Sequence, residues 1–139
     1  MNSSDFQKLT ALRLREAKVL MRNGCYAGSY YLAGYAVECA LKACIAAKTQ
    51  AAEFPPKPDI VREYYKHDLS GLVRFAGLGL DLEKHRQSVE EFALNWAAVK
   101  DWTEQTRYET KIDKRKASGL LQAIVDSKHG VLKWLKTYW

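Results

Sequence analysis

The sequence has 139 residues and is poor in the features that mark disulfide-bonded, metal-binding and common nucleotide-hydrolysing proteins. It holds three cysteines without a Cys-x-x-Cys pair and three scattered histidines, a pattern that predicts free thiols and no metal site. It has no P-loop, no Gly-x-Gly-x-x-Gly and no nucleophile elbow, so conventional ATP binding and serine hydrolase chemistry have no support. We expect neither a metal nor a cofactor.

A targeting signal is also missing at the start of the sequence. Residues 1–23 carry charges throughout and contain no apolar stretch of the kind that a secretory signal needs. Free thiols that behave as small apolar side chains fit a reducing compartment. We therefore expect a cytoplasmic protein.

Proline and strand-like patterns are scarce. The three prolines gather at Pro55, Pro56 and Pro58, which indicates a rigid connector. No segment alternates apolar and polar residues with a period of two. Apolar residues instead recur at helical spacing, most clearly from Val89 to Trp102. The sequence predicts one all-α domain over residues 1–139, an up-and-down bundle of four long helices plus one shorter helix.

Cap and stop signals set the expected bounds of these helices. A Ser4-x-x-Gln7 capping box is predicted to begin the first helix, and Asn23-Gly24 to end it. Further helices are predicted over 24–48, 69–76, 89–102 and 113–135, with a capped turn near residues 59–60 and an irregular segment at 103–110. Gly130 would lie inside the last helix and weaken it by roughly 1 kcal/mol relative to alanine.

The segment from Gly24 to Lys48 is nearly all apolar or small and long enough to cross a bilayer. Glu38 and Lys42 near its middle argue against a membrane helix. Four residues apart, they share a helix face and can pair. Either they form a structural pair, or Glu38 orients a histidine or arginine on a neighbouring helix.

Two motifs resemble a known family. The pattern Ala-x-x-Tyr-x-Leu-Ala-x-Tyr-Ala-x-Glu-x-x-Leu-Lys-Ala, from Ala27 to Ala43, resembles the second helix of HEPN (higher eukaryotes and prokaryotes nucleotide-binding) domains. The segment Lys66-His67-Asp68-Leu69 is similar to the start of the third helix of the same family. The resemblance implies a nucleotide- or nucleic-acid-binding module, a partner subunit of a nucleotidyltransferase or part of a toxin–antitoxin system. The alternatives are a metal-independent endoribonuclease and a purely structural dimerisation module.

Arg62 and His67 fit the Arg-x(4)-His spacing that the resemblance associates with ribonuclease branches of the family. A histidine can take the 2′-hydroxyl proton of RNA, and an arginine can stabilise the charge that develops on the phosphate. The sequence therefore offers Arg62 and His67 as candidate catalytic residues. The alternative is that the spacing is coincidental and His67 helps to orient the helix that follows it.

Basic residues concentrate near the C-terminus, where residues 111–139 carry seven basic and two acidic side chains, a net charge of +5. Such a segment can attract the phosphates of RNA or of a nucleotide. Lys114, Arg115 and Lys116, with Arg107, Lys66 and the Glu38–Lys42 pair, are the candidate binding residues. The alternative is a solvated helix face.

Tyrosines are frequent on the long apolar segment and inside the Arg-x(4)-His motif, at Tyr64 and Tyr65. Together with the small residues of the long segment they offer more apolar surface than one core of this size hides. We expect a homodimer that associates through these tyrosine-rich and small-residue surfaces.

Overall fold

The computed structural model describes residues 1–50, 62 and 67–139, and within these residues it is helical without any strand. The predicted all-α fold is confirmed. The described elements are α1 (Ser3–Arg22), α2 (Tyr26–Gln50), α4 (Leu69–Phe75), α5 (Gly79–Ser88), α6 (Glu90–Val99), the 3₁₀ helix η1 (Glu104–Tyr108), α7 (Lys114–Val125) and α8 (Val131–Leu135). No helix of this described part is both long and apolar enough to cross a membrane.

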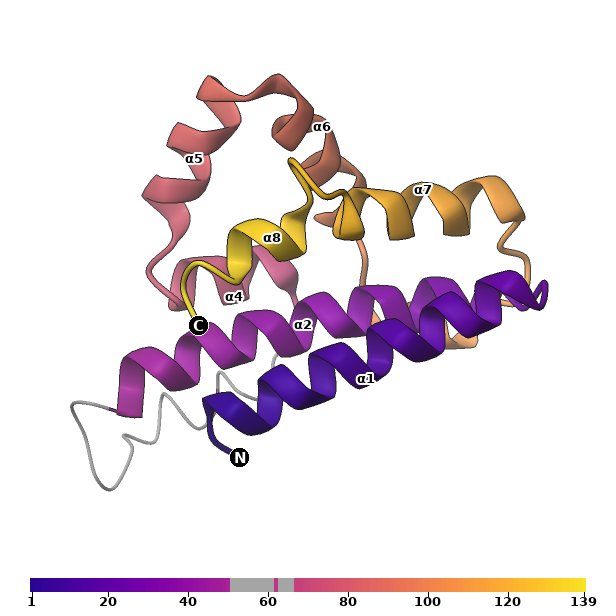
Figure 1. The fold of residues 1–139 in the computed structure, drawn as a ribbon, viewed down its shortest axis with the longest axis horizontal. Coiled ribbons are helices and arrows are strands. Elements are labelled where there is room, and N and C mark those ends of the chain that lie inside the picture. The colour runs from indigo at the N-terminus through magenta and orange to yellow at the C-terminus, as the bar shows by residue number, and fades with distance from the viewer. Residues whose placement is uncertain (51–61, 63–66) are drawn as a thin grey trace.

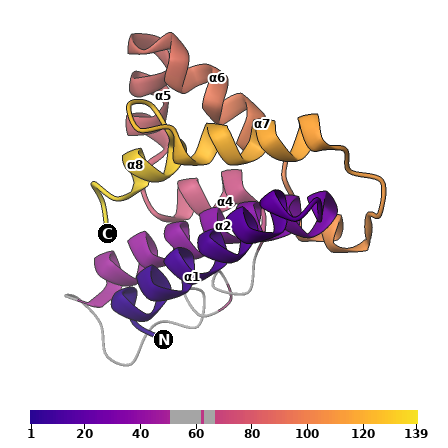
Figure 2. The same cartoon turned by 45° about the vertical axis from the view of Figure 1, so that its right-hand side comes forward.

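The helices lie in layers. The long helices α1 and α2 run side by side in opposite directions, and α7 and α8 lie between this pair and the α5–α6 pair (Figures 1 and 2). Helix α2 is central, because it contacts α1, α4, α7, α8 and η1. This position explains why so much of the α2 sequence is apolar on every side.

Helix α1 begins two residues earlier than the sequence indicates. Asn2, not Ser4, is the N-cap: its side chain accepts a hydrogen bond from the Asp5 amide, and the Asp5 carboxylate accepts one from the Asn2 amide. The predicted Ser4 capping box is therefore wrong. Ser3 is buried and donates from its hydroxyl to the Ala43 carbonyl at 2.9 Å, which ties the start of α1 to the C-terminal half of α2.

The small residues of α2 lie in the interior of the domain. Ala33, Ala36, Ala40 and Ala43 are fully buried, and a Cβ built on Gly34 would come within 2.2 Å of the Trp102 indole. Small side chains let the neighbouring elements approach α2 closely. The small-residue surface assigned to a homodimer interface is therefore used inside one chain, and the homodimer itself stays a prediction.

Helix α4 is capped by Asp68, whose side chain accepts from the Gly71 amide at 3.2 Å. The helix that follows, α5, has no counterpart in the prediction. It buries none of its residues, and Leu80 is 78% exposed, so it lacks the apolar stripe by which helices are recognised in a sequence. The capped turn predicted near residues 59–60 lies outside the described residues.

The last helical stretch is broken where the sequence predicts one continuous helix. Helix α7 begins where it is predicted to begin, just after Asp113, whose side chain accepts from the Lys116 amide, but it ends at Val125. The Asp126 side chain then accepts from the His129 amide at 2.8 Å, and Gly130 precedes α8. An aspartate that bonds the backbone three residues on offers a turn that competes with the helix. The segment at 103–110, predicted to be irregular, contains η1.

Candidate functional site

A buried carboxylate stands at the centre of the candidate site. Glu38, on the middle of α2, is 1% exposed and pairs through Oε2 with Lys42 Nζ at 3.1 Å. Lys42 is itself buried, so both charges of this pair are removed from water. A buried charge needs a partner of opposite sign and further hydrogen bonds. The second oxygen of Glu38 is therefore expected to have a partner as well.

That partner is His67, just before α4. His67 Nδ1 lies 2.8 Å from Glu38 Oε1, and Nε2 lies 2.8 Å from Oε2 of Glu104 on η1. The His67 side chain is 41% exposed, in contrast to the buried Glu38. Asp68, not His67, caps the helix that follows. The imidazole thus joins α2 to η1 with one side open to solvent.

The two contacts constrain where protons lie on the ring. A carboxylate only accepts hydrogen bonds, so an imidazole donates to Glu38 from Nδ1 and keeps a lone pair on Nε2 when it is neutral. The contact from Nε2 to Glu104 then needs a further proton, carried either by the ring or by Glu104. Through its two ring nitrogens His67 thus links a buried carboxylate to a partly exposed one.

Aromatic side chains cover the same flank of α2. The rings of Tyr31 and Tyr35 lie 6.2 Å apart, and Tyr31 lies 6.0 Å from the buried Trp102 ring. Burial raises the pKa of Tyr35 to about 12, with further contributions from Cys39 and Glu38. Tyr35 therefore keeps its phenolic proton near neutral pH.

The structure brings together three of the residues that the sequence singled out, namely Glu38, Lys42 and His67. Arg62 is exposed and makes no contact with this cluster within the described residues, and Lys66 lies outside them. Arg107, on η1, stacks over the Tyr108 ring with its guanidinium carbon 5.0 Å from the ring centre.

The basic residues predicted at the start of α7 lie apart from the cluster as well. Lys114, Arg115 and Lys116 occupy the exposed first turn of α7, and Lys116 Nζ lies 5.3 Å from the Tyr30 ring centre. Their phosphate-binding role stays a prediction.

Glu104 is the residue of the site that sequence reasoning missed. It lies in a polar connector with no apolar periodicity, 37 positions after His67. Nothing in the local sequence distinguishes it from the other exposed acids of the chain, because its role depends on how η1 packs beside α2. Within the described residues, no group of three or more His, Cys, Asp and Glu side chains could hold a metal ion.

The fold and this site define a class: a small all-α domain that carries a histidine held by carboxylates against its central helix. The sequence model of the HEPN domain matches residues 11–137, nearly the whole chain. The chain therefore belongs to the HEPN family. No curated protein and no solved structure matches it.

Proposed function

We propose that this HEPN domain binds RNA and cleaves it without a metal ion, with His67 as the proton-transfer group. The observation that carries the proposal is the contact between a half-exposed His67 and the buried Glu38 at 2.8 Å. A carboxylate behind an imidazole fixes its tautomer and orientation and stabilises the charged ring. The His67 side chain is 41% exposed, so a substrate could reach the ring once Glu104 moves away from Nε2.

In the proposed reaction His67 first accepts a proton from the RNA and then returns it. Nε2 of neutral His67 takes the proton of an RNA 2′-hydroxyl as the 2′-oxygen forms its bond to phosphorus. The bond from phosphorus to the 5′-oxygen breaks, and the imidazolium returns the proton to that oxygen. The products are a 2′,3′-cyclic phosphate and a 5′-hydroxyl. Glu104 must leave Nε2 before the substrate enters, and the exposed Arg62 is the proposed cation for the phosphate.

Cleavage of a fluorescent single-stranded oligoribonucleotide in excess EDTA tests the proposal. We expect cyclic-phosphate products from the unaltered chain, none from His67→Ala, and none when a 2′-O-methyl group replaces the nucleophile at the cleaved position. His129→Ala is the matched control, because the imidazole of His129 makes no contact with the cluster. Equal cleavage by His67→Ala and the unaltered chain would overturn the proposal.

A second candidate function is a binding module without chemistry, and the contact between Glu104 and Nε2 favours it. If Glu104 keeps that nitrogen occupied, the cluster serves to fasten η1 and α4 to α2. The domain would then bind RNA or a nucleotide as the partner subunit of a nucleotidyltransferase or in a toxin–antitoxin pair. RNA that is bound but left intact by both the unaltered chain and Glu104→Gln supports this candidate over the first.

A further inference from the structure

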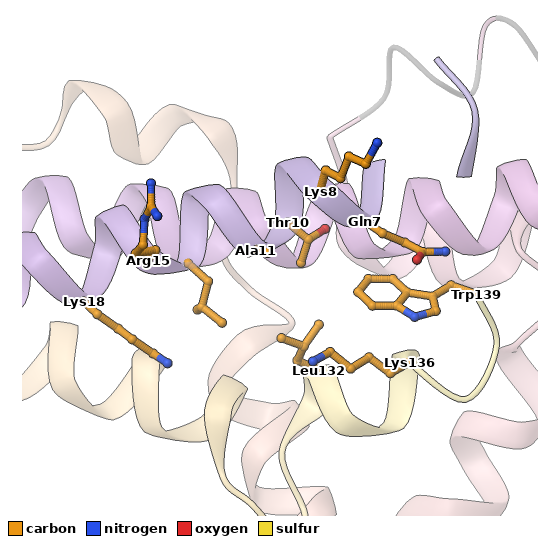
Figure 3. Close-up of a pocket in the computed structure, with 10 residues that line it drawn as sticks. Gln7, Lys8, Thr10, Ala11, Arg15, Lys18, Leu132, Lys136 and Trp139 are labelled. Atoms are coloured by element: carbon orange, nitrogen blue, oxygen red, sulfur yellow. The ribbon is translucent and has the colours of Figure 1, made fainter. Parts of the chain in front are cut away.

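A groove lies between α1 and the C-terminal segment that contains α8 (Figure 3). Its volume is about 550 Å³, within the usual range of ligand pockets. The residues that line it come from α1 and from the last eight positions of the chain: Gln7, Lys8, Thr10, Ala11, Leu14, Arg15, Lys18, Leu132, Lys136 and Trp139. None of them belongs to the His67 cluster.

The charged side chains that line the groove are all of one sign. Lys8, Arg15, Lys18 and Lys136 line it, and no acidic side chain does. None of the four cations pairs with a carboxylate within the described part of the chain. Uncompensated cations around a concave surface attract an anionic ligand.

The acids of α1 are already engaged elsewhere. Asp5 completes the N-terminal cap of the helix, and Glu16 pairs with Arg13 at 2.8 Å. Neither carboxylate is therefore available to neutralise the cations that line the groove.

The cations of α1 follow the helix axis. Lys8, Arg15, Lys18 and Arg22 are spaced by seven, three and four residues, so these cations form one stripe along the helix. At 1.5 Å per residue, the stripe from Lys8 to Lys18 extends over roughly 15 Å. In Figure 3, Lys18 extends into the space between the helices, whereas the side chains of Lys8 and Arg15, which also line the groove, point away from α8.

Part of the groove lining is apolar. Ala11, Leu14 and Leu132 are among the lining residues, and the Trp139 indole lies near Gln7 (Figure 3). Lys136 Nζ lies 5.9 Å from the Trp139 ring centre. A row of cations beside an aromatic ring is the combination that binds single strands, because the cations follow the phosphates while a base stacks on the ring.

We infer that the groove between α1 and α8 binds single-stranded nucleic acid, at a site separate from His67. The two sites share no residue. The groove is lined by α1 and the C-terminal segment, whereas α2, η1 and the residue before α4 supply Glu38, Glu104 and His67. The inference does not depend on cleavage at His67.

Binding of a fluorescent dT12 oligonucleotide, followed by anisotropy at several salt concentrations, tests the inference. This DNA has no 2′-hydroxyl, so the result is independent of the proposed ribonuclease activity. Four phosphate contacts predict that log affinity falls against log salt with a slope of about −3. We expect Arg15→Glu/Lys18→Glu to weaken binding at least about tenfold and to reduce the slope by about 1.5.

Lys84→Glu/Lys100→Glu is the matched control, with the same charge change on exposed residues of α5 and just after α6. Trp139→Ala should weaken binding, and Trp139→Phe should retain most of it because phenylalanine also stacks. Helical circular dichroism checks that each variant folds. An equal loss in the control pair, no binding of dT12 at low salt, or a deca-glutamate peptide that binds as tightly as dT12 would each overturn the inference.

Discussion

Glu38 shows, at the scale of single residues, how one side chain can have two functions. One of its carboxylate oxygens pairs with Lys42 on the same helix, and the other contacts His67, which precedes α4. The sequence offered these as alternatives, a structural pair or an orienting carboxylate. Both contacts exist, because a carboxylate has enough lone pairs for two partners.

Replacing the buried charge tests its structural contribution. Glu38→Gln keeps the shape but leaves Lys42 buried without a counter-charge, so we expect the free energy of unfolding to fall by about 3 kcal/mol. Glu16→Gln, which breaks the more exposed pair with Arg13, should change it by less than about 1 kcal/mol. Urea unfolding measures both. Adding Lys42→Met to Glu38→Gln should recover part of the loss, and a loss from Glu38→Gln no larger than that from Glu16→Gln would contradict this account.

A glycine on the central helix tests the close packing of α2. Gly34 faces the buried Trp102 indole, and an added Cβ would lie 2.2 Å from it. We expect Gly34→Ala to destabilise the domain by about 1–3 kcal/mol through overpacking. Gly119→Ala is the control on α7, because a Cβ there meets nothing within 4 Å. That change should stabilise by about 0.5–1 kcal/mol, and destabilisation by both alanines would contradict the packing argument.

At the scale of elements, capping side chains decide where helices begin. Asn2, Asp68 and Asp113 each accept a hydrogen bond from a backbone amide three residues on. The sequence predicts the start of α7 near Asp113 correctly but prefers Ser4 to Asn2 as the cap of α1. Ser4 and Asn2 are both good caps, and the choice follows from the packing of Ser3 against Ala43 on α2.

The effect of Gly130→Ala on stability distinguishes a break between α7 and α8 from a continuous helix, because the two structures predict changes of opposite sign. In a continuous helix over 113–135, Gly130→Ala would stabilise by roughly 1 kcal/mol. In the observed turn, a Cβ on Gly130 would lie 2.5 Å from the Asp126 carbonyl and 2.7 Å from the Ile124 carbonyl. We expect Gly130→Ala to destabilise by at least about 1 kcal/mol. Thermal or urea unfolding measures the sign, and a stabilised variant would contradict the break.

At the scale of the whole molecule, the packed core controls how stability depends on alkaline pH. Burial raises the pKa of both Cys39 and Cys44 from a usual 9.0 to about 12. The unfolded chain therefore loses these protons above pH 9 while the folded chain keeps them. Stability is full below that pH and falls as the pH rises from 9 toward 12, by about 1 kcal/mol per thiol between pH 8 and pH 10.

Urea unfolding at pH 8 and pH 10 measures this effect. Cys39→Ala/Cys44→Ala should lose less stability between the two pH values than the unaltered chain, whatever its stability at pH 8. Cys25→Ala is the control, since Cys25 is the exposed thiol, and should leave the difference unchanged. An identical pH dependence in the double variant would rule out the thiols as its cause.

Part of the candidate site could be predicted before the structure, because its signals are local. Glu38 and Lys42 are four residues apart on one helix, and His67 lies in a family motif. Glu104 and the groove cations could not be assigned in the same way. Glu104 lies in a connector without periodicity, and the stripe from Lys8 to Arg22 is visible as helical spacing but becomes a groove only when α8 packs beside it.

The sequence by itself determined the all-α class, the long central helix, the amphipathic α6 and the HEPN family, because helical periodicity and family motifs are properties of neighbouring residues. Only the tertiary structure decided that the small face of α2 is internal, that α7 ends at Val125, that Glu104 meets His67 and that a basic groove lies between α1 and the C-terminal segment. The physical reason is that burial and contacts between residues far apart in the chain depend on how the helices pack, and no local pattern specifies that packing.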